Sequence, residues 1–130
     1  MSLFLGVFDG DREIEGWVFG HYSDFGAFRD AVRRLAGEGF PTLLTVSDAN
    51  GTWSASECET LRTELAAIRG KLSSRPPVEL KNAFEHTLDQ RRRARSAADC
   101  FHNVDGENVF DAIDSLCAVA IKSGHPIVFQ

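Results

Sequence analysis

The pattern of apolar and polar positions predicts a hairpin at the start of the chain. The run SLFLGVF at Ser2–Phe8 is apolar enough for a buried strand, and the run WVFGHY at Trp17–Tyr22 resembles a second strand. Between them, Asp9 and Gly10 form a strong turn signal, because glycine readily adopts the backbone conformations that tight turns require. We therefore expect residues 2–22 to form two antiparallel strands.

Apolar spacing then changes to steps of three and four, which is typical of an amphipathic helix. The apolar positions of this helix are Phe25, Phe28, Val32 and Leu35. Ser23 or Asp24 is the expected N-cap, and Gly37 marks the end of the helix. The following run PTLLTVSD, Pro41–Asp48, favours a middle strand that ends in a DANG turn.

A second helix is marked at its start and along its length. Ser54 and Glu57 have the spacing of a capping box, in which each side chain bonds to the other residue's backbone N–H. A stripe of apolar positions follows at Cys58, Leu61, Leu65, Ile68 and Leu72. The prolines of SSRPP, residues 73–77, break this helix. Leu80, Phe84 and Leu88 are four residues apart and predict another one.

The segment FHNVDGENVF, Phe101–Phe110, looks like either a ligand loop or the start of the last helix. We expect Asp105 to be the N-cap and Asn108 to occupy position N3, with Glu107 favoured by the helix dipole in the first turn. A metal or substrate loop remains the alternative, although the ligand pattern of a calcium loop and the glycine-lysine pattern of a phosphate loop are both absent from the sequence. The helix itself has a clear apolar face and ends at Gly124.

These elements predict one α+β domain over residues 1–130. A small sheet, made of the N-terminal hairpin, a middle strand and a C-terminal strand, is expected to pack against about four helices. The final run PIVF is apolar throughout, so we expect this strand to lie inside the sheet rather than at its edge.

Composition adds few functional constraints. The chain is 43% hydrophobic and 25% charged, as in ordinary globular proteins, and its net charge of −5 is opposite to that of a general nucleic-acid binder. The three cysteines show no C-x-x-C spacing, and Cys58 and Cys117 fall on apolar helix positions, which indicates buried free thiols. We find no signal peptide and no run long enough to span a membrane, and we expect a cytoplasmic protein.

Candidate catalytic chemistry is sparse. The four histidines have no metal-binding spacing relative to one another or to the cysteines, so we expect no metal and no cofactor. Cys100, His102 and Asp105 lie close together in the sequence and are the first residues to test if the protein is a small cytosolic enzyme. No catalytic serine elbow or dinucleotide fingerprint is present in the sequence.

Two charged clusters are candidates for partner binding. The acids Asp9, Asp11, Glu13 and Glu15 alternate along the hairpin and would share one side of an extended chain. The cluster Arg91–Arg95 lies in residues 75–95, whose net charge of +3 contrasts with a net charge of −4 on each flanking segment. Binding of nucleic acid through these arginines is an alternative function, although no aromatic residue interleaves with them.

The C-terminal part of the chain resembles a known class of proteins. The letters VDGE, a helix rich in Leu and Ala, a glycine, and then PI and FQ at the end look like small immunity proteins of bacterial polymorphic toxin systems. The match is most specific at residues 101–130. It implies a compact, non-catalytic α+β protein that binds a cognate toxin domain in the cytoplasm of the producing cell and blocks its active site or substrate path. The acidic residues of the hairpin are then the expected contact surface for the toxin. Both a monomer and a homodimer fit the sequence.

Overall fold

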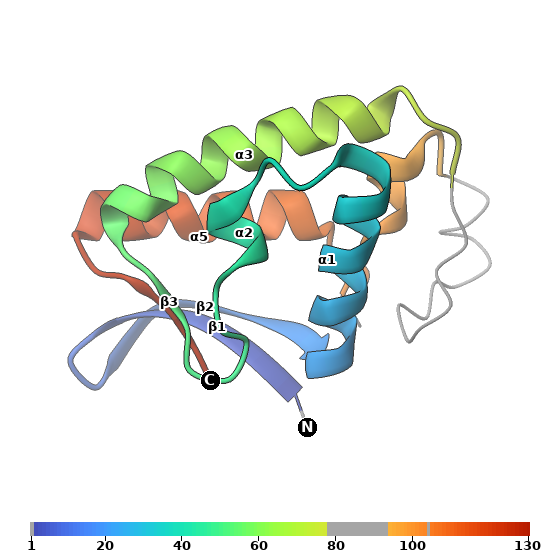
Figure 1. The fold of residues 1–130 in the computed structure, drawn as a ribbon. Coiled ribbons are helices and arrows are strands. Elements are labelled where there is room, and N and C mark those ends of the chain that lie inside the picture. The colour runs from blue at the N-terminus through green and yellow to red at the C-terminus, as the bar shows by residue number, and fades with distance from the viewer. Residues whose placement is uncertain (1, 78–93, 104) are drawn as a thin grey trace.

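The computed structural model describes residues 2–77, 94–103 and 105–130, and it shows an antiparallel sheet of four strands. Their order across the sheet is β2-β1-β4-β3 (Figure 1). The strands are β1 (Ser2–Asp9), β2 (Arg12–His21), β3 (Thr52–Trp53) and β4 (Ile127–Phe129). The N-terminal hairpin is confirmed, with Gly10 in the left-handed region at φ 60°.

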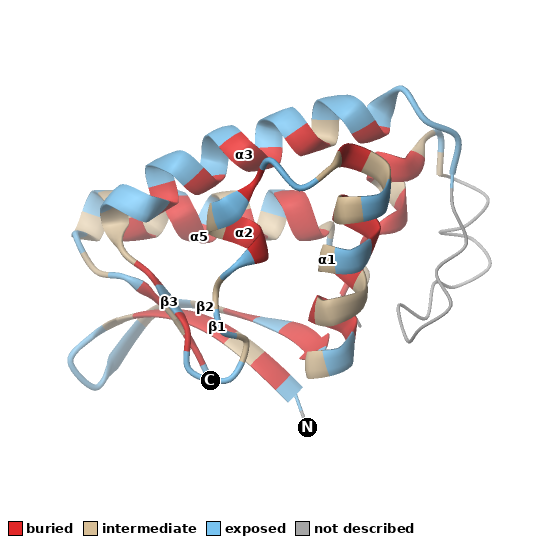
Figure 2. Cartoon of the chain, in the orientation of Figure 1, coloured by how far each residue is buried: buried red, intermediate tan, exposed pale blue. Residues whose placement is uncertain are grey.

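The helices lie together on one face of this sheet, and α3 and α5 run side by side (Figure 1). They are α1 (Tyr22–Ala36), α2 (Pro41–Leu44), α3 (Ala55–Ser73), the 3-10 helix η1 (Ala97–Cys100) and α5 (Val109–Ser123). α1, α3 and α5 each expose one side to solvent and bury the other (Figure 2). The predicted α+β class is confirmed. The predicted helix at Leu80, Phe84 and Leu88 falls outside the described residues.

The C-terminal strand lies inside the sheet, as its apolar sequence predicted. Leu5 of β1 pairs with Phe129, and Trp53 of β3 pairs with Ile127. β4 therefore has a hydrogen-bonded neighbour on each side. Both of its inward side chains are buried, and Phe129 contacts Trp53 edge-on at 4.8 Å between ring centroids.

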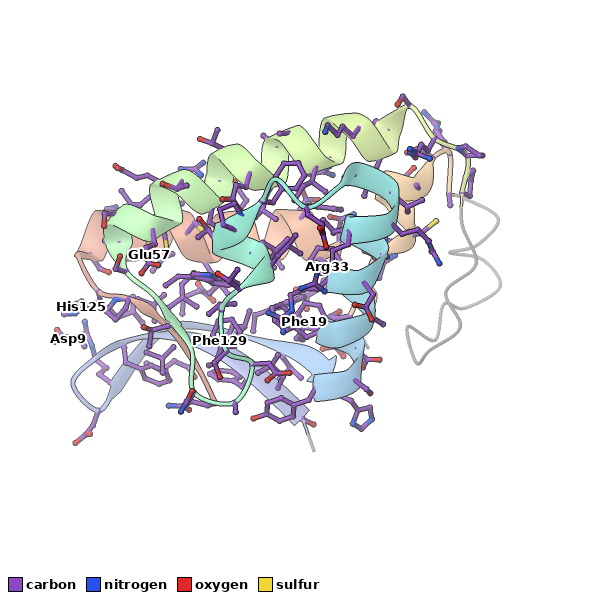
Figure 3. The ribbon with its side chains drawn as sticks, in the orientation of Figure 1. Asp9, Phe19, Arg33, Glu57, His125 and Phe129 are labelled. Atoms are coloured by element: carbon purple, nitrogen blue, oxygen red, sulfur yellow. The ribbon has the colours of Figure 1, made fainter. Side chains whose placement is uncertain are left out.

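Aromatic rings fill the space between the sheet and the helices. Phe19 points inward from β2 and meets Phe25 of α1 edge-on at 5.3 Å (Figure 3). Phe28, one turn further along α1, meets Phe101 and Phe110 at 5.3 and 5.6 Å. Edge-on aromatic pairs add to the stability gained from burial, so this chain of rings ties both ends of the sequence into one core.

The predicted strand at Pro41–Asp48 is wrong, because its first four residues form helix α2. Pro41 begins this short helix, where its missing N–H costs nothing. The buried carboxylate of Glu64 on α3 accepts hydrogen bonds from the backbone N–H groups of Thr42 and Leu43, at 3.2 and 3.1 Å. At the other end, Arg33 donates to the carbonyl of Leu44 at 3.1 Å. Side chains distant in sequence thus satisfy both ends of α2.

The predicted caps of α1 are also corrected. The N-cap is His21, not Ser23 or Asp24. Asp24 occupies position N3 instead, and its carboxylate accepts a hydrogen bond of 2.7 Å from the backbone N–H of His21. The helix ends at Gly37 as predicted, with a φ of 99°. The sequence therefore placed the helix start too late and assigned the N-cap to the wrong residue.

The start of α3 agrees with the sequence in atomic detail. The hydroxyl of Ser54 accepts from the N–H of Glu57 at 3.1 Å, and the Glu57 carboxylate accepts from the N–H of Ser54 at 3.1 Å. The helix ends at Ser73, just before the two prolines. Local signals were sufficient here because both partners of the capping box lie within one turn.

Candidate functional site

The loop before α5 is organised by Asn103, a buried residue to which the sequence pattern assigned no role. Its side-chain oxygen accepts from the N–H groups of Asp105 and Glu107 at 3.0 and 2.9 Å. Its amide nitrogen donates to the carbonyl of Val18 and to the carboxylate of Glu107, both at 2.9 Å. Asn103 therefore folds its own loop and fastens that loop to β2.

The N-cap of α5 is Asn108, so the prediction of Asp105 as the cap is wrong. Asn108 accepts a hydrogen bond of 3.1 Å from the N–H of Asp111, and Asp105 is exposed. Gly106 sits between them at a positive φ of 80°. The segment does begin a helix. The helix begins later because the Asn103 side chain closes a turn by accepting from the N–H groups of Asp105 and Glu107, a pattern that Asn favours.

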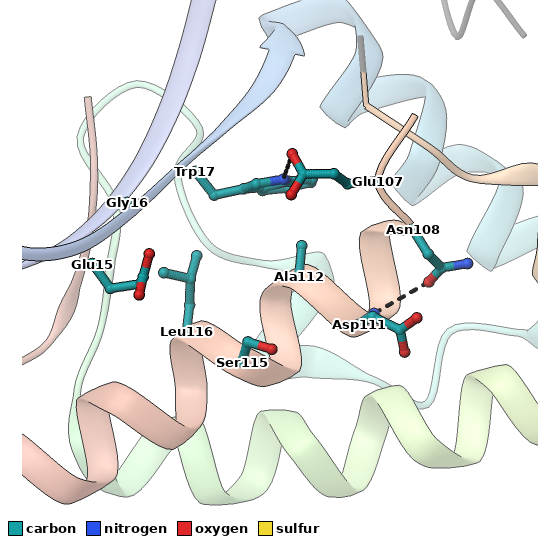
Figure 4. A pocket seen from close by; sticks show the side chains of 9 residues that line it. All are labelled: Glu15, Gly16, Trp17, Glu107, Asn108, Asp111, Ala112, Ser115 and Leu116. Atoms are coloured by element: carbon teal, nitrogen blue, oxygen red, sulfur yellow. Dashed lines mark hydrogen bonds between the residues drawn. The ribbon is translucent and has the colours of Figure 1, made fainter. Parts of the chain in front are cut away.

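A surface cavity of about 240 Å³ lies between β2 and α5 (Figure 4). Glu15 and Trp17 line it from the strand, whereas Glu107, Asp111 and Leu116 line it from the helix side. The Glu107 carboxylate accepts a hydrogen bond of 3.2 Å from the indole N–H of Trp17. Glu107 thus joins the loop to the sheet, and the cavity has three carboxylates on its lining.

The three carboxylates of this cavity differ in whether a basic side chain neutralises their charge. Asp111 forms an ion pair with Arg69 of α3 at 2.5 Å. Across the described ranges, none of the ion pairs includes Glu15 or Glu107. Glu107 instead receives neutral N–H groups, and Glu15 is exposed. Glu15 and Glu107 therefore carry the less compensated negative charge of the cavity.

A second surface cavity, of about 230 Å³, lies between α3 and α5. Arg62 binds Asp114 at 2.8 Å along its lining, and the Arg69 guanidinium lies 5.9 Å from the ring centre of Phe110. Its charges are paired across the two helices. We interpret this cavity as part of the packing between α3 and α5.

The four acids of the hairpin are all exposed, but they do not share one side as predicted. Glu13 pairs with Phe8, whereas Glu15 pairs with Val7, and these neighbours on β1 point to opposite faces of the sheet. The extra residue is Ile14, at a register shift in β2. The prediction that the acids share one side therefore fails, because the bulge interrupts the alternation of side chains between the two faces of the sheet. Asp9 lies at the hairpin end, 3.7 Å from the imidazole of His125 (Figure 3).

Cys100, His102 and Asp105 do not line either cavity described above. Cys100 is buried, and its thiol lies 3.6 Å from the carbonyl of Ser96. Burial lowers the pKa of His102, with the nearby Asp99 opposing that shift. Asp105 is exposed. The arrangement gives no support to the alternative of a small enzyme built on these three residues.

The other candidate groups contribute little to a site. Within the described ranges there is no group of three His, Cys, Asp or Glu side chains that could hold a metal ion. Among the same residues, no helix is long and apolar enough to cross a membrane. Arg91, Arg92 and Arg93 fall outside the described residues. Arg95 is exposed, and its backbone N–H donates to the carboxylate of Asp99 at 2.9 Å.

Fold and surface together define a small acidic α+β protein whose described cavities are open and lie beside exposed carboxylates. The chain belongs to the Immunity protein 70 family, because the model of that family matches residues 11–129. No curated protein and no solved structure matches the chain. The resemblance to immunity proteins is confirmed, and membership favours a non-enzymatic role with a toxin as the general kind of partner.

Trp17, Asn103 and Glu107 are the residues of this region that sequence analysis missed. The contact between Trp17 and Glu107 joins residues 90 positions apart, so no local pattern could indicate it. A weaker signal existed for Asn103, because Asn two residues before Asp-Gly is typical of a turn closed by the Asn side chain.

Proposed function

We propose that this protein binds the toxin domain of a bacterial polymorphic toxin and neutralises it without catalysis. The observation that carries this proposal is membership of an immunity-protein family over nearly the whole chain. On this proposal it acts in the cytoplasm of the producing cell, where it blocks the active site or the substrate path of the toxin.

The contact surface that we propose is the acidic arm, defined as Asp9, Asp11, Glu13 and Glu15. All four carboxylates are exposed at or near the end of the β1–β2 hairpin. Among residues 9–15, Arg12 is the one basic residue. A local excess of negative charge on a protein of net charge −5 attracts a basic partner and speeds its diffusional encounter.

Glu15 extends this surface toward the helices. It belongs to the acidic arm and also lines the cavity between β2 and α5, beside Glu107. Glu107 is held in place by Trp17 and Asn103. A Lys or Arg side chain of the toxin that enters this region would meet at Glu107 a carboxylate that is already positioned, which reduces the entropy lost on binding.

The direct test uses the gene immediately upstream of the one that encodes this chain. The C-terminal domain of its product is purified and titrated with this protein by calorimetry, and the two are also co-expressed in a growth assay. We expect tight one-to-one binding and rescue of growth. A domain that is toxic but neither binds nor is silenced by this protein would overturn the proposed function.

A further inference from the structure

The face of the sheet that points away from the helices is apolar. We call this the outer sheet face, and its members follow from the strand register: Phe4 pairs with Val18, Gly6 pairs with both Gly16 and Val128, Phe8 pairs with Glu13, and the exposed Thr52 pairs with Val128. Facing residues of paired strands point to the same side of a sheet. Figure 1 shows the helices on the opposite face.

A pair of glycines makes this face flat. A Cβ atom on Gly6 would lie 2.6 Å from the Phe8 ring, and one on Gly16 would lie 2.2 Å from the Phe4 ring. Both distances are too short for real contacts, so the two rings occupy the space that side chains would otherwise fill. Their centroids are 6.4 Å apart. The rings therefore lie over the glycines as a preformed apolar surface.

The outer sheet face is more apolar than a solvated sheet face usually is. An antiparallel sheet with one wet face normally alternates apolar and polar residues. Here the outward positions of the two longest strands include Phe4, Phe8 and Val18. Val18 is 37% exposed and is the one large hydrophobic residue classed as exposed in the described part of the chain. Exposed apolar patches on soluble proteins commonly mark interaction sites.

Negative charge borders this apolar face on the side of the hairpin. Glu13 belongs to the face itself, and its carboxyl carbon would be 3.0 Å from a Cβ atom on Gly16. Asp11 lies in the adjoining turn and is exposed. The acidic arm and the apolar rings are thus continuous, which matches the usual plan of an interface with an apolar centre and a polar rim.

We propose that the outer sheet face is the apolar centre of the toxin-binding interface, with Asp11 and Glu13 of the acidic arm on its rim. The occupant is a toxin domain with an apolar patch bordered by Lys and Arg. This inference rests on the proposed function and adds to it the surface that carries most of the binding energy. A second copy of this chain fits poorly, since each copy has a net charge of −5 and its own acidic rim.

The test compares two variants with the same change in charge. Val18→Arg places a cation on the outer sheet face opposite Phe4, whereas Ala67→Arg places one on the exposed side of α3. Binding of the purified toxin domain encoded upstream is measured by calorimetry, and folding by thermal melting. We expect Val18→Arg to weaken binding by about tenfold or more and Ala67→Arg to leave it within about twofold, with both variants folded.

Each other outcome overturns a distinct statement. If the wild-type chain binds and both variants bind equally well, the proposed function stands and the outer sheet face is not the interface. If the wild-type chain does not bind, the proposed function fails and this inference fails with it. If sedimentation shows that the chain alone forms a dimer that Val18→Arg separates, a second copy occupies the face and the proposal is wrong.

Discussion

At the scale of single residues, Asn103 carries more of the local structure than any of the charged residues around it. Four hydrogen bonds use its side chain, and one of them reaches beyond its own turn, to the carbonyl of Val18. Asn103 itself is 6% exposed and its hydrogen bonds are partly buried, so removing its side chain would leave several polar groups without their protein partner.

We therefore expect Asn103→Ala to lower the free energy of unfolding by about 2–3 kcal/mol, because several hydrogen bonds are lost together. Asp105→Ala is the matched control, because Asp105 is exposed and does not cap α5. We expect the control to change stability by less than about 0.5 kcal/mol. Urea unfolding of both variants decides the point, and a larger loss for Asp105→Ala would contradict the assignment of the cap.

Gly20 and Gly70 should respond in opposite directions to the same substitution. Gly20 has a φ of 138°, and a Cβ atom there would lie 2.6 Å from the carboxylate oxygen of Asp24. We expect Gly20→Ala to destabilise the protein by about 1–3 kcal/mol. Gly70 is helical, with no heavy atom near its Cβ position, so Gly70→Ala should stabilise α3 by up to about 1 kcal/mol. Thermal melting of the two variants tests this prediction. Equal shifts of the two melting temperatures would contradict it.

The lowered pKa of His102 predicts that the stability of the protein depends on pH. Burial lowers its pKa in the folded state below the ordinary value, so the unfolded chain binds the proton more readily. The neutral imidazole is therefore favoured by folding. Its contribution is complete above the unfolded pKa of about 6.5 and is lost as the pH falls toward the lower folded pKa. Wild-type stability should decline more between pH 7.5 and 5.5 than that of His102→Gln, as measured by urea unfolding at each pH.

At the scale of elements, helix α2 depends on Glu64 of α3. Its carboxylate is buried and accepts from two N–H groups at the start of α2. We expect Glu64→Ala to cost about 1–3 kcal/mol, because these groups would lose their partner inside the protein. Glu59→Ala on the exposed side of the same helix is the control and should fall within about 0.5 kcal/mol of wild type in urea unfolding. Equal effects would show that Glu64 does not cap α2.

The contrast between α3 and α2 shows which elements can be predicted from the sequence. The capping box of Ser54 and Glu57 lies within one turn, and the structure contains it as predicted. The residues of α2 favour a strand locally, but Glu64 and Arg33 bind its two ends from other helices. Local propensity is overridden when tertiary contacts satisfy the backbone of a different element.

The candidate site follows the same division. The acidic arm was visible because charge alternation is a local pattern, although the bulge at Ile14 separated Glu13 from Glu15. The contacts of Glu107 with Trp17, and the stacking of Phe4 and Phe8 over two glycines, require the sheet register. Sequence analysis therefore found the acidic arm and missed the apolar outer sheet face.

At the scale of the whole molecule, the ion pairs between helices and the exposed apolar surface lie on different sides of the protein. The helices cover the inner face of the sheet, and the paired arginines of α3 neutralise acids of α5. The outer sheet face, with Asp11 and Glu13 of the acidic arm at its border, lies on the other side of the sheet. A partner approaching from that side meets the long-range field of the arm first and the apolar surface at contact.

Reversing the charge of residues in the acidic arm should therefore change the rate of association with the toxin domain more than the rate of dissociation. We expect Asp11→Lys combined with Glu13→Lys to slow binding of the toxin domain by about tenfold at low salt and to flatten its salt dependence, since steering by distant charges is screened. The control, Glu38→Lys combined with Glu59→Lys, makes the same change in net charge at exposed positions of the α1–α2 loop and α3. Stopped-flow measurement at two salt concentrations separates the two cases. Slowing of equal size in both double variants would mean that net charge alone steers the encounter, and an unchanged rate in both would exclude the arm as the contact rim.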